Sequence, residues 1–134
     1  MKIRSLCAKY DNRKWEQQFL KEYRAWIASG FAKSAESSRN WLLQFYNHHY
    51  LDGNIPFRPQ PYQKEGILRT IYMLEFFSTE EPDGKNIPLN FLGVEMATGT
   101  GKTLVMANII SWASNAIVNG DPFCEMFILL CRIL

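Results

Sequence analysis

A glycine-rich segment, residues 96–103, has the residue types of a loop that binds phosphate groups. Glycine lets backbone N–H groups turn toward an anion because no Cβ stands in the way, and Gly99 and Gly101 supply that freedom. Lys102 can reach the β- and γ-phosphates of a nucleotide, and the Thr103 hydroxyl can ligate Mg²⁺. The segment therefore predicts a site for ATP with Mg²⁺. The predicted phosphate-binding residues are Thr98, Gly99, Thr100, Gly101, Lys102 and Thr103, the last also being the predicted Mg²⁺ ligand.

The match to the general phosphate-loop pattern, G-x-x-x-x-G-K-[ST], is partial, because Met96 stands where that pattern has its first glycine. The position of the segment between two predicted elements strengthens the phosphate-loop interpretation. Residues 89–96 are predicted to form a short strand and residues 102–118 a helix, and a phosphate loop connects these two kinds of element. A glycine-rich turn without a ligand would explain the composition but not this position. We therefore favour the phosphate-binding interpretation.

Two segments together resemble a known family. Residues 96–103, preceded by Val94 and Glu95, resemble motif I of superfamily 2 helicases and translocases, in which the first glycine is commonly replaced. Within these DEAD/DEAH-like proteins they are most similar to the ATPase subunit of type III restriction enzymes. Further upstream, residues 61–67 are similar to the Tyr-Gln-x-Glu-x-Ile segment that opens such motor domains. The resemblance covers about residues 57–134, the opening of a motor core.

The resemblance implies roles for residues outside the loop. Gln63 is implied to read the adenine edge, for which a carboxamide offers a paired donor and acceptor. Phe57 and Arg58 are the candidates for stacking on the base, although the family usually places its arginine closer to the Tyr-Gln pair. In the complete protein the resemblance implies a DNA-dependent ATPase that moves on duplex DNA. DNA and a modification subunit, or the remainder of the motor, are its implied partners.

The acidic residue that such ATPases use to hold magnesium is missing from the sequence. It follows a later strand in a DEAD/DEAH-like motif, and Asp121 and Glu125 come too soon after the predicted helix to serve. We therefore expect this chain to bind ATP without hydrolysing it alone, although the family implies a hydrolase. The sequence ends at Leu134, within a predicted strand, which is typical of a fragment, a truncated product or a chain that pairs with another.

The elements that must position these residues are predicted from apolar periodicity. Three- and four-residue steps over residues 13–29 predict an amphipathic helix that ends at Gly30. Further helices are predicted over residues 35–46 and 62–77, and an exposed turn over residues 79–88. The side chains predicted to be buried in the first two helices are Trp15, Phe19, Leu20, Tyr23, Trp26, Ile27, Trp41, Leu42, Phe45 and Tyr46.

A strand over residues 125–134 completes a predicted strand–loop–helix–strand order. The predicted fold class is therefore α/β: an incomplete P-loop NTPase (RecA-like) βαβ unit preceded by an amphipathic helical segment. The proline-rich residues 51–61 are the predicted boundary. They separate a helical amino-terminal region, residues 1–55, from the truncated start of a RecA-like ATPase domain, residues 56–134.

Composition sets limits on the function. The net charge of +2 divides into +5 over residues 1–60 and −3 over residues 61–134, which suits either a nucleic-acid contact or, as we favour, a solvated helical surface. No apolar run approaches the ~20 residues of a membrane span, and the scattered charges of residues 1–12 argue against a secretory signal. Three cysteines without a CxxC pair favour reduced thiols and a cytoplasmic location. A non-catalytic helical interaction module with a vestigial P-loop is the alternative function, and a small nucleotide kinase is a weaker one.

Overall fold

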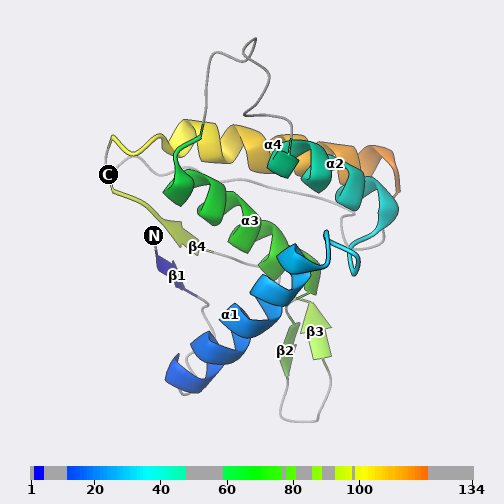
Figure 1. Cartoon of the computed structure of the whole chain (residues 1–134). Helices are drawn as coiled ribbons and strands as arrows, with labels where there is room; N and C mark the ends of the chain where they lie inside the picture. Colours follow the sequence, from blue (N-terminus) through cyan, green and yellow to red (C-terminus); the bar gives the residue numbers. More distant parts are fainter. Residues whose placement is uncertain are drawn as a thin grey trace.

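Four helices form most of the structure, a computed structural model that describes residues 2–4, 12–47, 59–76, 78–80, 86–88, 93–97 and 99–120. The helices are α1 (Asn12–Ala28), α2 (Glu36–Asn47), α3 (Pro61–Phe76) and α4 (Lys102–Val118). The described strands have three residues each: β1 (Lys2–Arg4), β2 (Ser78–Glu80), β3 (Asn86–Pro88) and β4 (Gly93–Glu95). The helices predicted over residues 13–29, 35–46, 62–77 and 102–118 are therefore confirmed, and Figure 1 shows their arrangement.

The predicted α/β fold class, a RecA-like βαβ unit, is wrong for the described chain, which is mainly helical. β4, which precedes the phosphate loop, pairs with β1 in antiparallel register, with Ile3 opposite Val94. The second described sheet is also antiparallel and joins β2 to β3, within the segment predicted as a turn. The parallel pair that defines a βαβ unit is absent from both described sheets. The strand predicted over residues 125–134 lies outside the described residues.

The end of α1 has a Schellman motif. The N–H of Phe31 donates to the carbonyl of Trp26, and the N–H of Gly30 donates to that of Ile27, both at 3.0 Å. This pair of bonds requires a left-handed residue, and Gly30 has φ 66°. The Trp26 and Phe31 rings meet edge to face, 4.7 Å between centroids, which is the hydrophobic contact that accompanies such a motif. Gly30 thus ends the helix as predicted.

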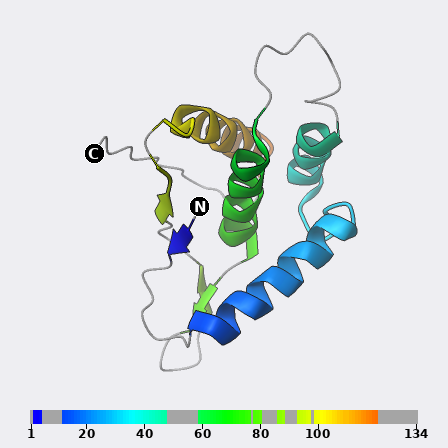
Figure 2. The same ribbon diagram turned by 60° about the vertical axis from the view of Figure 1, so that its left-hand side comes forward.

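Helix α3 lies at the centre of the core, with the other three helices around it (Figure 2). Phe19, Tyr23 and Trp26 of α1 pack around its Tyr72, with ring centroids 5.6, 6.0 and 5.3 Å from that ring. These three residues are buried, as predicted. Tyr46 was also predicted to be buried and is exposed. The side chain of Trp15 lies outside the described residues.

Helix α4 packs on α2 and α3. Its buried residues recur at helical spacing and form one face: Val105, Ile109, Trp112, Ala113 and Ala116. The helix ends before Asn119 and Gly120, and Gly120 has φ 69°. α4 therefore has a defined length and a defined face, which fixes the direction in which its amino terminus points.

A polar network inside the core joins all four helices through the carboxylate of Glu75. Ser34 donates to one carboxylate oxygen at 2.6 Å, and Ser38 donates to the other. Each serine oxygen also accepts from an indole: Trp26 donates to Ser34 at 2.9 Å, and Trp112 donates to Ser38 at 2.8 Å. The indoles belong to α1 and α4, so the helices on both sides of the predicted boundary share one core. The boundary itself stays a prediction.

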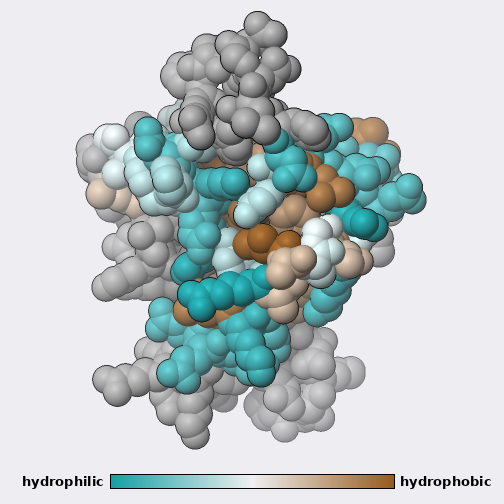
Figure 3. Space-filling model, in the orientation of Figure 1, coloured by the Kyte–Doolittle hydropathy of each residue, from teal (hydrophilic) through white to brown (hydrophobic). Residues whose placement is uncertain are grey.

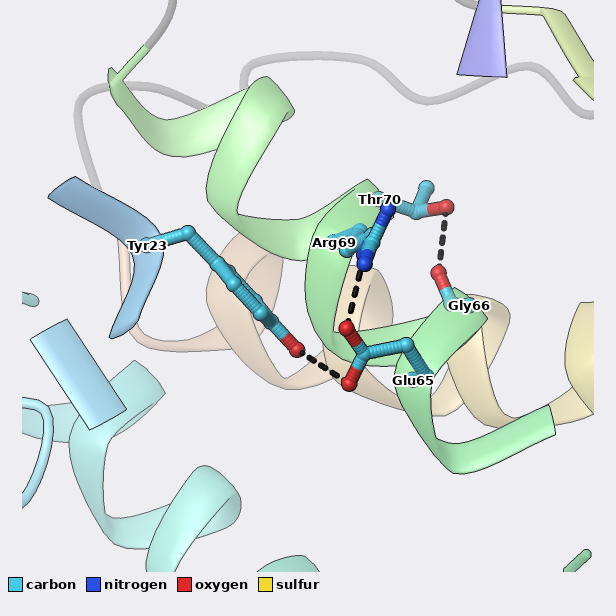
Figure 4. A network of polar contacts seen from close by, with 5 residues as sticks. All are labelled: Tyr23, Glu65, Gly66, Arg69 and Thr70. Atoms are coloured by element: carbon cyan, nitrogen blue, oxygen red, sulfur yellow. Dashed lines mark hydrogen bonds and ion pairs between the residues drawn. The ribbon is translucent and has the colours of Figure 1, made fainter. Parts of the chain in front are cut away.

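A second polar contact joins α1 to the solvent side of α3. Glu65 accepts a hydrogen bond from Tyr23 at 3.0 Å on one oxygen and from Arg69 at 2.8 Å on the other (Figure 4). Burial, then the Glu65 charge, raises the pKa of Tyr23. Burial, then the Glu22 carboxylate, raises the pKa of Tyr72 from 10.0 to about 12. Both phenols are therefore held in their neutral form.

The described surface on the side seen in Figure 1 is mainly hydrophilic, with hydrophobic residues showing near the centre, over α3 (Figure 3). None of the described helices combines the length and apolar character needed to cross a membrane.

Replacing Ser38 by alanine tests the Glu75 network. Ser38→Ala leaves the buried Trp112 N–H without its acceptor and removes one donor to Glu75, so we expect it to lower the free energy of unfolding by about 2 kcal/mol. Ser111→Ala is the control, because Ser111 accepts from the indole of Trp41 in an exposed contact. It should cost less than about 1 kcal/mol. Urea unfolding measures both, and equal costs would contradict the network's importance.

Alkaline pH should destabilise the fold through the tyrosines. The folded-state pKa of Tyr72 is raised, so the stability that it contributes is complete below its ordinary pKa of 10.0 and is lost as the pH rises toward about 12. Urea unfolding from about pH 8 to about pH 11 should show this decline. In Tyr72→Phe the decline should be shallower. A decline of equal steepness in the two proteins would contradict the assignment.

Candidate nucleotide-binding site

The phosphate loop, residues 96–103, has two glycines in the left-handed conformation. Gly99 has φ 76° and Gly101 has φ 78°, values that L-residues with a side chain disfavour. Gly101 occupies the position before α4, and this helix has no side-chain cap. The N–H groups of Leu104 and Val105 donate to the Gly101 carbonyl, at 3.1 and 3.3 Å. The N–H groups that precede them, on Lys102 and Thr103, belong to the first turn, where a helix binds anions.

The remaining loop contacts hold its ends together. The side chain of Met96 packs against the hydrophobic core. The hydroxyl of Thr100 donates to the carbonyl of Ala97 at 2.5 Å, so this side chain closes the loop on itself. Lys102 is half-buried and Thr103 is exposed, at the start of α4. Of the residues predicted to bind phosphate, Thr98 lies outside the described residues, as do the predicted base-stacking candidates Phe57 and Arg58.

Gln63 lies against the loop. It is in the first turn of α3, its side chain is 6% exposed, and its Nε2 donates to the Thr100 carbonyl at 2.7 Å. Its Oε1 accepts from the backbone N–H of Gln60 at 2.8 Å, which is one half of a capping box. The two contacts fix the orientation of the carboxamide, because one requires a donor and the other an acceptor. The structure thus brings Gln63 together with Thr100 and Gly101.

A side chain at Gly101 would have to displace the carboxamide of Gln63. A Cβ at this position would lie 2.2 Å from Gln63 Nε2, well inside van der Waals contact. At Gly99, by contrast, a Cβ would meet nothing within 4 Å. Gly101 is therefore required for two reasons, its positive φ and the proximity of Gln63, whereas Gly99 is required for its φ alone.

The Gln63 carboxamide retains hydrogen-bonding capacity beyond its loop contacts. An amide side chain has two N–H donors and two acceptor lone pairs. The bonds to Thr100 and Gln60 use one of each, so one donor and one acceptor remain at Gln63. This pair is what an adenine edge requires. The predicted role of Gln63 in reading adenine is compatible with its role in holding the loop.

Tyr62 is a loop contact that the sequence analysis did not assign. Its hydroxyl donates to the Thr100 carbonyl at 3.1 Å, so this one oxygen accepts from two consecutive residues of α3. The ring is 44% exposed. Its position beside Gln63 in the Tyr-Gln pair was the available signal, but periodicity says nothing about a contact with a loop 38 residues away.

Alanine at the two loop glycines separates backbone conformation from the Gln63 contact. Gly99→Ala should cost about 1 kcal/mol of stability for its positive φ. Gly101→Ala should cost at least about 1 kcal/mol more, because it also displaces the Gln63 carboxamide and breaks its bond to Thr100. In a Gln63→Ala background the two substitutions should cost the same. Thermal unfolding of these variants measures the stability costs. If Gly101→Ala still costs more than Gly99→Ala when residue 63 is alanine, the contact with Gln63 does not explain the difference.

The comparisons with known proteins point to one family. A family model described as "Type III restriction enzyme, res subunit" matches residues 56–123, just over half of the chain. This match includes Gln63, the phosphate loop and α4. None of the curated proteins and none of the solved structures matches the chain. The chain belongs to the family of the res subunit of type III restriction enzymes.

Proposed function

We propose that this chain is the Mg²⁺–ATP-binding part of a DNA-dependent ATPase of the type III restriction kind. The observation that carries the proposal is the contact between Gln63 and the loop carbonyl at Thr100, 2.7 Å long. It puts a carboxamide suited to adenine beside a loop suited to phosphates. The base-reading and phosphate-binding groups, which lie far apart in the sequence, thus belong to one site.

The groups at this site suit a nucleotide polyphosphate with magnesium. The amino terminus of α4 carries the positive end of the helix dipole, and the Lys102 ammonium adds a full charge at the same place. The Thr103 hydroxyl is a hard oxygen donor of the kind that Mg²⁺ accepts alongside waters and phosphate oxygens. Bound Mg²⁺ would neutralise phosphate charge there. These residues bind and orient the phosphates.

The wider activity is proposed for the complete protein and follows from the family. A complete protein of this kind would couple ATP hydrolysis to movement on duplex DNA. DNA, a modification subunit and the remainder of the motor are the proposed partners. The described part of this chain supplies residues for holding the nucleotide.

Removing the charge of Lys102 tests nucleotide binding. Calorimetric titration of the wild-type chain with Mg²⁺–ATP should give saturable binding, and Lys102→Ala should weaken it at least about tenfold, because a charge-assisted hydrogen bond is lost. Lys33→Ala is the matched control, since it removes the same charge from the exposed turn between α1 and α2. It should leave the affinity unchanged.

Equal affinities of wild type and Lys102→Ala would overturn the proposal and favour the helical interaction module with a vestigial loop.

A comparison of ATP with GTP tests whether Gln63 reads the base. Wild type should prefer ATP to GTP, and Gln63→Ala should lose that preference because the donor–acceptor pair is gone. A preference that survives in Gln63→Ala would assign adenine recognition to another residue.

A further inference from the structure

The carbonyl of Thr100 is the point at which α3 holds the loop by side-chain hydrogen bonds. It accepts from Gln63 Nε2 at 2.7 Å and from the Tyr62 hydroxyl at 3.1 Å. A carbonyl oxygen has two lone pairs, so these two donors use its full capacity. Both donors come from the first turn of α3, whose following residues are buried in the core. The Thr100 carbonyl is thereby bonded to the helix at the centre of the core.

We propose that Tyr62 is a positioning residue for phosphate binding: its hydroxyl holds the Thr100–Gly101 peptide so that the Gly101 N–H faces the phosphate. The inference rests on the proposed function. In a trans peptide the C=O and the N–H point in opposite directions within one plane, and the described residues contain no cis peptide. Because the carbonyl points toward α3, the Gly101 N–H points away from it.

The second hydrogen bond matters because glycine makes this peptide easy to rotate. Rotation of this peptide changes ψ of Thr100 and φ of Gly101, and Gly101, which has no side chain and already has φ 78°, permits a wide range of φ. Gln63 alone would leave one lone pair of the carbonyl free for water. With Tyr62 in place, a rotation of the peptide must break two bonds together. The donor thus stays in position before any ligand arrives.

The hydroxyl, and not the ring, is the group that this role requires. Tyr62→Phe keeps the ring and removes only the bond to Thr100, so folding should be preserved and the melting temperature close to that of wild type. Tyr46→Phe is the matched control. It also removes the hydroxyl of an exposed tyrosine, one that makes no hydrogen bond to the loop among the described residues.

The experiment compares two probes, Mg²⁺–ATP and Mg²⁺–tripolyphosphate, by calorimetry on the full chain. Tyr62→Phe should weaken both by the same factor, about three- to tenfold, because the lost contact serves the phosphates. The preference for ATP over GTP should not change. In the free protein, the Gly101 amide should exchange its hydrogen at a different rate in Tyr62→Phe, while the amides of the middle of α4 should not. Tyr46→Phe should match wild type in every measurement.

Results that differ from these expectations would overturn either the role of Tyr62 or the proposed function. Suppose that wild type binds both probes, that Lys102→Ala loses this binding, and that Tyr62→Phe binds both probes as tightly as wild type. That result would overturn the role of Tyr62 and leave the proposed function standing. A loss confined to ATP would also overturn that role, because the hydroxyl would then serve the base or the ribose. Absence of binding by wild type would overturn the proposed function and this inference with it.

Discussion

The carboxylate of Glu75 accepts hydrogen bonds from Ser34 and Ser38, and each serine in turn accepts from the indole of a tryptophan. The two serines belong to α2 and the turn before it, and the two indoles belong to α1 and α4, so the network connects residues of all four helices. The Glu75 carboxylate is partly buried, so its hydrogen bonds to the serines offset the loss of solvent around it and favour this arrangement of the helices. The aromatic core around Tyr72 supplies the apolar burial, and the Glu75 network selects one arrangement of the helices within it.

The same helix that carries Glu75 near its end carries Tyr62 and Gln63 in its first turn. Gln63 and Glu75 are twelve positions apart in α3, which corresponds to about 18 Å along the helix axis. At one end α3 is tied to the other helices, and at the other end it holds the phosphate loop through the Thr100 carbonyl. The loop conformation therefore depends on a core to which α1 and α2 contribute. The amino-terminal helices are part of the support of the site.

Sequence patterns predicted the parts of the molecule that local chemistry determines. The spacing of Phe19, Tyr23 and Trp26 marked the buried face of α1, and Gly30 marked its end. Gly99 and Gly101 were predicted to give the loop its backbone freedom, and both have the positive φ that glycine permits. The resemblance singled out Gln63, which lies at the loop. In each case the relevant neighbours are a few residues apart or belong to a motif.

Sequence patterns could not predict what depends on long-range contacts. β1 has only three residues, too few for a periodicity, so its antiparallel pairing with β4 was not predicted. The hydrogen bonds of Glu75 were not predicted because its serine partners lie 37 and 41 residues away in the sequence. The loop contact of Tyr62 was not predicted for the same reason, since Thr100 lies 38 residues away in the sequence. Tyr46 has the spacing of a core residue, yet its ring is exposed beneath the Lys64 ammonium, 3.8 Å from the ring centroid.

We propose that the start of α3 and the phosphate loop form one nucleotide site. Nuclear magnetic resonance of the isotope-labelled full chain during titration with Mg²⁺–ATP tests it most directly. If they form one site, the backbone amide signals of Gly101 and Lys102 and the side-chain amide signal of Gln63 should shift together with one midpoint, while the amide signals of α1 stay in place. Shifts absent from the loop, or confined to the exposed basic residues of α1, would contradict it.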